Sequence, residues 1–185
     1  MLKKIILAAS ILSLIGSFPV FAQEKPIGFL FKDKSPIKVY IKEVINASGE
    51  DQISPEFFKE SLQQSLLDRK LVKFEIADDP DGSDIQASVI IKKYRYLKRG
   101  PVKPIPGVSI VLDVAASLTA NYVEMSVEYT VTDTKTNEIL WSRTVNENLK
   151  KVMTPEESIP LICKKISRTF VWKCFGRKQD LEGGS

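Results

Sequence analysis

Apolar and polar residues alternate most regularly between residues 122 and 145 of this 185-residue chain. The period of two is typical of a strand with one buried and one solvent-exposed face. Residues 133–137 interrupt it with Asp, Thr, Lys and Asn, which favour turns, and a second run starts at Ile139. The sequence therefore predicts a long antiparallel hairpin with a connection of about five residues. The side chains expected to face the core are Val123, Met125, Val127, Tyr129, Val131, Ile139, Trp141 and Val145.

Further strands are predicted upstream of the hairpin. Alternating patterns indicate strands over residues 37–45 and 85–97, and a short strand over residues 71–77. Residues 27–31 fit either an edge strand or an apolar arm that lies on the core.

Two helices complete the predicted order of elements. A Ser-Pro-Glu start favours a helix over residues 55–70, because the serine caps and the proline tolerates the first helical position. Thr154 and Glu157 form a capping-box pattern before a second helix. Pro160, one turn later, leaves Ser158 as an alternative cap. The sequence thus predicts an α+β fold, a two-layer sandwich. It combines a mixed, mostly antiparallel sheet and a long C-terminal hairpin with two helices packed on one face.

The N-terminus has the pattern of an export signal. Lys3 and Lys4 precede an apolar run over residues 5–15, and Ala22 ends a small-residue cleavage pattern. The alternative, an uncleaved anchor, needs a run of about 20 apolar residues. We expect a periplasmic protein, which could also associate with the outer membrane. We predict a signal peptide over residues 1–22, an N-terminal arm over 23–36, a single α+β domain over 37–175 and a flexible tail over 176–185.

Charge and composition narrow the function. The chain carries 27 basic and 23 acidic residues, a net charge of +4, and no histidine. Without histidine, imidazole-based acid–base chemistry and the commonest zinc sites are excluded. So small a basic excess argues against nucleic acid as a partner. We expect a protein that is not an enzyme and has no cofactor, catalytic residue or resident metal.

Two acidic groups could in principle bind a metal ion or act in catalysis. Residues 78–84 could supply carboxylates to calcium, but they lack the full ligand loop and fit a tight turn better. Glu124 and Glu128 lie about 13 Å apart along an extended strand. This separation exceeds that of glycosidase carboxylate pairs.

The two cysteines allow two interpretations. Export favours a disulfide between Cys163 and Cys174. However, eleven residues of helix separate them by about 16 Å, and a disulfide needs Cα atoms within about 7 Å. Unless the helix ends near Phe170 and the chain folds back, the thiols stay separate.

Two segments are candidate binding sites. Tyr94 and Tyr96 alternate with cations and could hold a polyanionic ligand, or they could belong to an edge strand protected by Lys and Arg. The proline-bounded segment 108–119, either strand or loop, could dock a partner or pack on its own domain. The candidate binding residues are Tyr94, Tyr96, Lys98, Arg99, Val108, Ile110 and Leu112.

Several motifs resemble a group of bacterial envelope proteins. They are the capped helix at 55–70, the strand at 73–77, the entry into a long strand at 82–89, and the strand–turn–strand at 129–141. In this order they resemble the LPS-assembly lipoprotein (LptE-like) family and the TolB N-terminal and CsgG-like modules. Asn137 stands where that pattern usually has glycine, and the lipid-anchoring cysteine is missing.

The resemblance and the export signal imply a binding or assembly role. We expect a module that binds another envelope protein, or a lipid or glycolipid such as lipopolysaccharide. The alternatives are a periplasmic ligand-binding protein that uses Tyr94, Tyr96 and nearby cations, and a homo-oligomeric subunit of an envelope complex.

Overall fold

The computed structural model describes residues 26–31, 33–70, 72–98 and 121–176. The predicted signal peptide, Arg99 and the segment 108–119 lie outside these residues, and so does the predicted tail after Gly176. The elements are the 3-10 helix η1 (Ile27–Phe31), β1 (Ile37–Asn46), α1 (Pro55–Leu67), β2 (Phe74–Ala77), β3 (Ile85–Leu97), β4 (Asn121–Asp133), β5 (Ile139–Lys151) and α3 (Pro155–Phe175).

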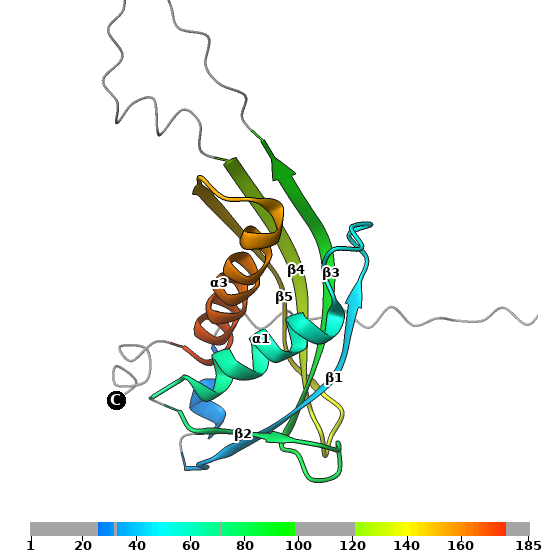
Figure 1. Ribbon diagram of the computed structural model, residues 1–185. Helices are drawn as coiled ribbons and strands as arrows, with labels where there is room; N and C mark the ends of the chain where they lie inside the picture. The colour runs from blue at the N-terminus through cyan, green and yellow to red at the C-terminus, as the bar shows by residue number, and fades with distance from the viewer. Residues whose placement is uncertain (1–25, 32, 71, 99–120, 177–185) are drawn as a thin grey trace, which may run out of the picture.

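One open sheet and two helices form two layers (Figure 1). The strand order is β2-β1-β3-β4-β5; β1 runs parallel to β2 and β3, and the pairs β3–β4 and β4–β5 are antiparallel. Both helices cover the same face: α1 contacts β1 and β2, α3 contacts β4 and β5, and the helices contact each other. The predicted α+β class, the mixed sheet and the hairpin are confirmed.

Aromatic side chains hold the two layers together. The Tyr129 ring stacks on Phe170 of α3 with centroids 4.2 Å apart and an interplanar angle of 12°. Trp141 meets the same phenylalanine edge-on at 5.5 Å, and Phe58 of α1 lies 6.5 Å from Tyr129. These side chains are fully buried. The alternating residues of β4 thus supply the core that the sequence predicts.

Bulges in three strands change which face a residue occupies. The register of β3 shifts between Ile91 and Lys93, so that Ile91 and Tyr94 are both buried. Their positions differ by three, which would place them on opposite faces of a regular strand. A second shift, where β5 pairs with Thr132 of β4, leaves Ile139 45% exposed, contrary to its predicted core position. In β1 the shift lies between Ile41 and Glu43.

The structure decides three alternatives that the sequence leaves open. The strand β3 pairs with β4 along its whole length but with β1 only from Ile85 to Ile91. In the described residues, the half of β3 that carries Tyr94 and Tyr96 therefore has one unpaired edge, as expected for an edge strand protected by Lys and Arg. Residues 27–31 form a 3-10 helix rather than a strand, and Ile27 is buried in the core, as expected for an apolar arm. The cap of α3 is Thr154, not Ser158, and Pro160 is accommodated inside the helix.

The cysteines are free thiols. Cys163 and Cys174 are both buried in α3, which continues without a break from Pro155 to Phe175. The helical separation that argued against a disulfide therefore holds in the structure.

Candidate functional site

A groove lies between α3 and the outer strand β5, with a volume of about 950 Å³. We call it the α3–β5 groove. Its basic lining residues are Arg143, Lys151, Lys164, Lys165, Arg168 and Lys173. The remaining residues of the lining are Pro26, Glu147, Leu149, Leu161, Thr169 and Trp172.

The amphipathic pattern of α3 produces one wall of the groove. Residues that recur every three or four positions, among them Ile162, Ile166 and Phe170, are buried against the sheet. The flank of the helix toward β5 carries Leu161, 42% exposed, and Trp172, 49% exposed, among basic residues. Large apolar side chains that stay exposed between cations are typical of a surface that binds a partner.

The charge of the groove is strongly positive. Six basic side chains and one acidic side chain give the lining a net charge of +5, although the whole chain carries only +4. Lys165 is partly neutralised, because its Nζ lies 3.0 Å from Glu147 Oε2. In the part of the chain that the structure describes, Lys151, Lys164, Arg168 and Lys173 form no ion pair within 4.0 Å. The groove therefore favours an anionic partner.

Hydrogen bonds connect α3 to β5 inside the groove. Thr169 Oγ1 donates to Glu147 Oε1 at 2.7 Å, and the opposite carboxylate oxygen holds Lys165. Lys165 Nζ also donates to the backbone carbonyl of Asn148 at 2.7 Å. Residues from α3 and β5 thus meet across the groove and hold its walls together.

The groove borders an unpaired strand edge. Among the strands that the structure describes, β4 is the only one that pairs with β5. The Asn148 carbonyl accepts a side-chain hydrogen bond, so the backbone of this residue turns away from β4. Register is regular from Trp141 to Lys151, and successive backbone groups of a strand alternate between its two edges. Thr144 and Asn146 therefore also turn their backbone groups outward.

The predicted tyrosine site is partly internal. Tyr94 is 6% exposed and its hydroxyl is hydrogen bonded to Ser158 Oγ at 2.8 Å. Burial raises the pKa of the Tyr94 hydroxyl, which stays protonated at neutral pH. The Tyr96 hydroxyl donates to the Met153 carbonyl at 2.7 Å. Because the β3 bulge turns both rings toward the helix layer, they attach α3 to the sheet. Lys98 is exposed, and Arg99, Val108, Ile110 and Leu112 lie outside the described residues.

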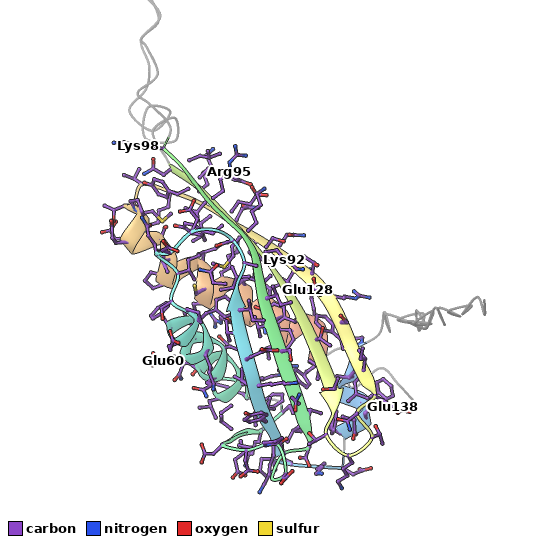
Figure 2. The ribbon with its side chains drawn as sticks, turned by 90° about the vertical axis from the view of Figure 1, so that its right-hand side faces the viewer. Glu60, Lys92, Arg95, Lys98, Glu128 and Glu138 are labelled. Carbon is purple, nitrogen blue, oxygen red and sulfur yellow. The ribbon has the colours of Figure 1, made fainter. Side chains whose placement is uncertain are left out.

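Cations near these tyrosines occupy the opposite face. Lys92 Nζ lies 2.9 Å from Glu128 Oε2, and Lys93 Nζ lies 2.9 Å from Glu124 Oε2. Figure 2 shows Lys92 and Glu128 together on the face of the sheet that the helices leave open. The structure therefore brings the tyrosines and these lysines to different sides of β3, and it gives Glu124 and Glu128 lysine partners.

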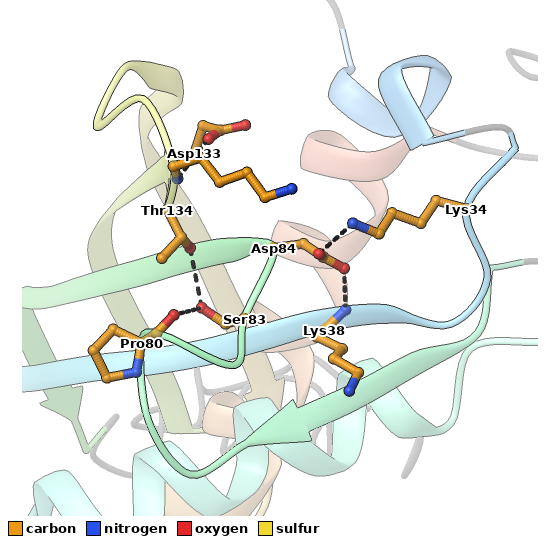
Figure 3. A network of polar contacts seen from close by, with 8 residues as sticks. Lys34, Lys38, Pro80, Ser83, Asp84, Asp133 and Thr134 are labelled. Carbon is orange, nitrogen blue, oxygen red and sulfur yellow. Dashed lines mark hydrogen bonds and ion pairs between the residues drawn. The ribbon is translucent and has the colours of Figure 1, made fainter.

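The acidic loop at residues 78–84 is organised as a turn (Figure 3). Asp79 Oδ1 accepts from the Gly82 N–H at 2.7 Å, and Ser83 Oγ donates to the Pro80 carbonyl at 2.8 Å. Asp84 accepts from the Lys38 N–H at 2.9 Å and forms an ion pair with Lys34. In the described residues, no group of three or more His, Cys, Asp or Glu side chains is placed to hold a metal ion.

None of the described helices is both long and apolar enough to cross a bilayer.

The comparisons with known proteins concern the fold. No protein-family model and no curated protein matches the chain. It is similar to the solved structure of protein XCC0632 from Xanthomonas campestris, described with the family model DUF330, at a TM-score of 0.51 and 11% identity. That match covers 89% of this chain and 93% of the other chain.

Two further matches have TM-scores below 0.5. One is PelC from Paraburkholderia phytofirmans, a dodecamer (TM-score 0.49, 11% identity, 75% of this chain and 88% of that chain). The other is lipoprotein GNA1162 from Neisseria meningitidis (TM-score 0.40, 9% identity, 74% of this chain and 99% of that chain).

The solved structures that this chain resembles thus include bacterial lipoproteins. At 11% identity, the likeness to XCC0632 shows a shared fold and leaves function to be argued from the site. The relationship to the LptE-like, TolB and CsgG-like groups stays a prediction.

Proposed function

We propose that the protein is an exported, non-enzymatic binding module that holds another component of the bacterial envelope in the α3–β5 groove. The observation that carries this proposal is the combination of a +5 lining with the exposed side chains of Leu161 and Trp172. Neighbouring cations and apolar surface select a partner that is both anionic and partly apolar.

Two features of the sequence support the rest of the proposal. The basic and apolar start of the chain has the pattern of an export signal. The absence of histidine removes the commonest general base from the chain. A role in envelope assembly, like that implied by the LptE-like resemblance, follows if the partner is an envelope protein or lipid. Self-association into a homo-oligomer is a further hypothesis, which sedimentation velocity tests directly.

Photo-crosslinking in cells of the source organism tests the groove as a binding site. A photoreactive amino acid replaces Leu161 in the groove or, as a control, the exposed Lys42 on β1. We expect a discrete adduct from position 161 and none of the same size from position 42.

Charge reversal makes the test specific. The double substitution Lys164→Glu and Arg168→Glu should abolish the adduct, because both side chains line the groove. The control Lys42→Glu with Lys73→Glu changes the net charge equally at exposed positions outside the groove and should preserve the adduct. Equal labelling at positions 161 and 42, or no adduct at 161, would contradict the proposed function.

A further inference from the structure

We infer that the partner of the α3–β5 groove is an acidic, extended segment of another protein that adds as a strand to the outer edge of β5. This inference rests on the proposed function and specifies its partner and binding mode. An exposed strand edge offers backbone donors and acceptors, and neighbouring side chains then select among peptide sequences.

The outer edge of β5 offers these backbone groups. The strand is 13 residues long, and no strand in the described residues pairs with it on the side away from β4. The backbone groups of Thr144, Asn146 and Asn148 point to that side. A strand placed there would lie about 4.8 Å from β5.

A partner strand would replace one hydrogen bond that is present at this edge. The Asn148 carbonyl now accepts a hydrogen bond from Lys165 Nζ, a flexible donor whose side chain is 43% exposed. A backbone N–H of an added strand would satisfy this carbonyl instead. Lys165 would keep its contact with Glu147, which lies 3.0 Å away.

The groove selects the chemistry of the added strand. Side chains of that strand that point toward the helix layer would lie over the groove, because alternate side chains of neighbouring strands share a face. There they meet Lys164 and Arg168, beside the apolar surface of Leu149 and Trp172. Acidic residues with apolar residues between them satisfy both kinds of surface.

The same cations disfavour other occupants of the edge. If β5 paired with β5 of a second copy, Arg143, Lys150 and Lys151 of the two strands would repel one another. Basic residues along an edge strand commonly prevent unspecific pairing. An acidic segment is attracted by the charges that exclude these competitors.

Synthetic peptides of about ten residues, the length of a typical strand, test this inference. The first probe is a fluorescent peptide of alternating Glu and Val, which offers an acidic and an apolar face. The second probe has N-methylated amides at central positions on both edges, which removes backbone donors and keeps the charge. The third probe alternates Lys and Val. We expect binding of the first peptide, measured by fluorescence anisotropy, and at least about tenfold weaker binding of the other two.

Protein variants locate the binding site. Asn148→Pro removes an outward N–H that pairs with no described strand, and we expect at least about tenfold weaker binding of the Glu-Val peptide. Asn148→Ala keeps the N–H and should bind like the unchanged protein. Lys164→Glu with Arg168→Glu should also weaken binding about tenfold, whereas Lys42→Glu with Lys73→Glu should not. Thermal unfolding confirms that each variant is folded, and Asn146→Pro replaces Asn148→Pro if the latter is not.

Other outcomes overturn the inference separately from the proposed function. Equal affinity for the methylated and unmethylated Glu-Val peptides would show attraction by charge without strand addition. Binding to phosphatidylglycerol vesicles but not to the Glu-Val peptide would identify the occupant as anionic lipid. A dimer that loses assembly on Asn148→Pro would identify it as a second copy. In all three cases, crosslinking from position 161 could still support the groove as a binding site.

Discussion

Asp84 connects three segments that are far apart in the sequence. Its carboxylate accepts from the Lys38 N–H at the start of β1 and pairs with Lys34, and its backbone N–H donates to the Lys38 carbonyl at 2.8 Å. Its own carbonyl accepts from the Thr134 N–H in the hairpin turn at 3.2 Å. One residue thus holds the hairpin end of the sheet to the segment that precedes β1.

Replacing Asp84 should destabilise the fold in a pH-dependent way. Burial alone would raise the pKa of the Asp84 carboxyl, but hydrogen bonds from Lys34 and Lys38 and nearby positive charges lower it overall. A lowered folded-state pKa contributes stability above the unfolded pKa of about 3.9, and this stability is lost as the pH falls through the folded value. We expect Asp84→Asn to lose about 1–2 kcal/mol of unfolding free energy in urea at pH 7.

The matched control for Asp84 is Asp81→Asn, an exposed position in the same loop. It should change the unfolding free energy by less than about 0.5 kcal/mol. The difference between Asp84→Asn and the unchanged protein should shrink below about pH 4. A difference that grew with acid would contradict the role of the ionised carboxylate.

The two thiols should be unreactive in the folded protein. Burial raises the pKa of Cys163 to about 12 and that of Cys174 well above its ordinary value. Because the thiolate is the reactive form, neither cysteine should react with Ellman's reagent at pH 8. Unfolding in guanidinium without reductant should release both thiols. Fewer than two thiols per chain after unfolding would contradict the free state of the cysteines.

At the scale of elements, the hairpin is closed by local turn chemistry. Asp133 Oδ1 accepts from the N–H groups of Lys135 and Thr136, at 2.8 and 3.0 Å. Asn137 adopts a left-handed conformation with φ of 58°, and its N–H donates to the Asp133 carbonyl at 2.9 Å. This five-residue connection sets the register between β4 and β5.

Substitutions at Asn137 should separate backbone strain from side-chain contacts. A β-branched residue is strained at positive φ, so Asn137→Val should lose about 1–2 kcal/mol of unfolding free energy in urea. Asn137→Gly tolerates this conformation and should stay within about 0.5 kcal/mol of the unchanged protein. Equal losses for both substitutions would instead assign the stability to contacts of the amide side chain.

Local patterns and tertiary contacts explain which elements could be predicted. The hairpin, both helix starts and the capping box of α3 depend on residues close in sequence, and their order was predicted correctly. The bulge in β3 depends on the register with β4, which no local pattern records. Regular alternation placed Tyr94 and Tyr96 in a candidate surface site. The bulge turns both side chains toward the helix layer instead, where they form hydrogen bonds.

The candidate site was missed for a similar reason. Its walls come from β5 and α3, and only the packed structure brings Arg143 and Leu149 next to Arg168 and Trp172. The local signal was the exposed series Leu161, Lys164, Arg168 and Trp172 in the C-terminal helix. That series indicates an apolar and basic helix flank, but it cannot show that a strand edge lies beside it.

At the scale of the whole molecule, the strands of the sheet differ in how many neighbours they pair with and how deeply they are buried. The strand β4 pairs on both sides, and its residues Val123, Met125, Val127, Tyr129 and Val131 are fully buried. The outermost described strand on the groove side, β5, pairs only with β4. Stability should therefore be higher in the centre of the sheet than at the edge that borders the groove.

Residue-resolved hydrogen exchange should display this gradient and test the open edge. We expect the slowest exchange in β4, and in β5 an alternation in which Val145 and Glu147 exchange slowly and Asn146 and Asn148 exchange quickly. The exchange rates of neighbouring amides in β5 should differ by about a hundredfold. Only the amides that are hydrogen bonded to β4 require the strand pair to open before they exchange. The amides of β4 serve as the internal control in the same spectra.

Addition of the Glu-Val peptide should then slow exchange at Asn146 and Asn148 and leave β4 unchanged. This pattern would place the peptide backbone on the edge, which a change in affinity alone does not do. Uniform slow exchange along β5 before any peptide is added would mean that another strand already pairs with this edge. Such a strand would close the only side from which a partner segment could extend the sheet beside the groove.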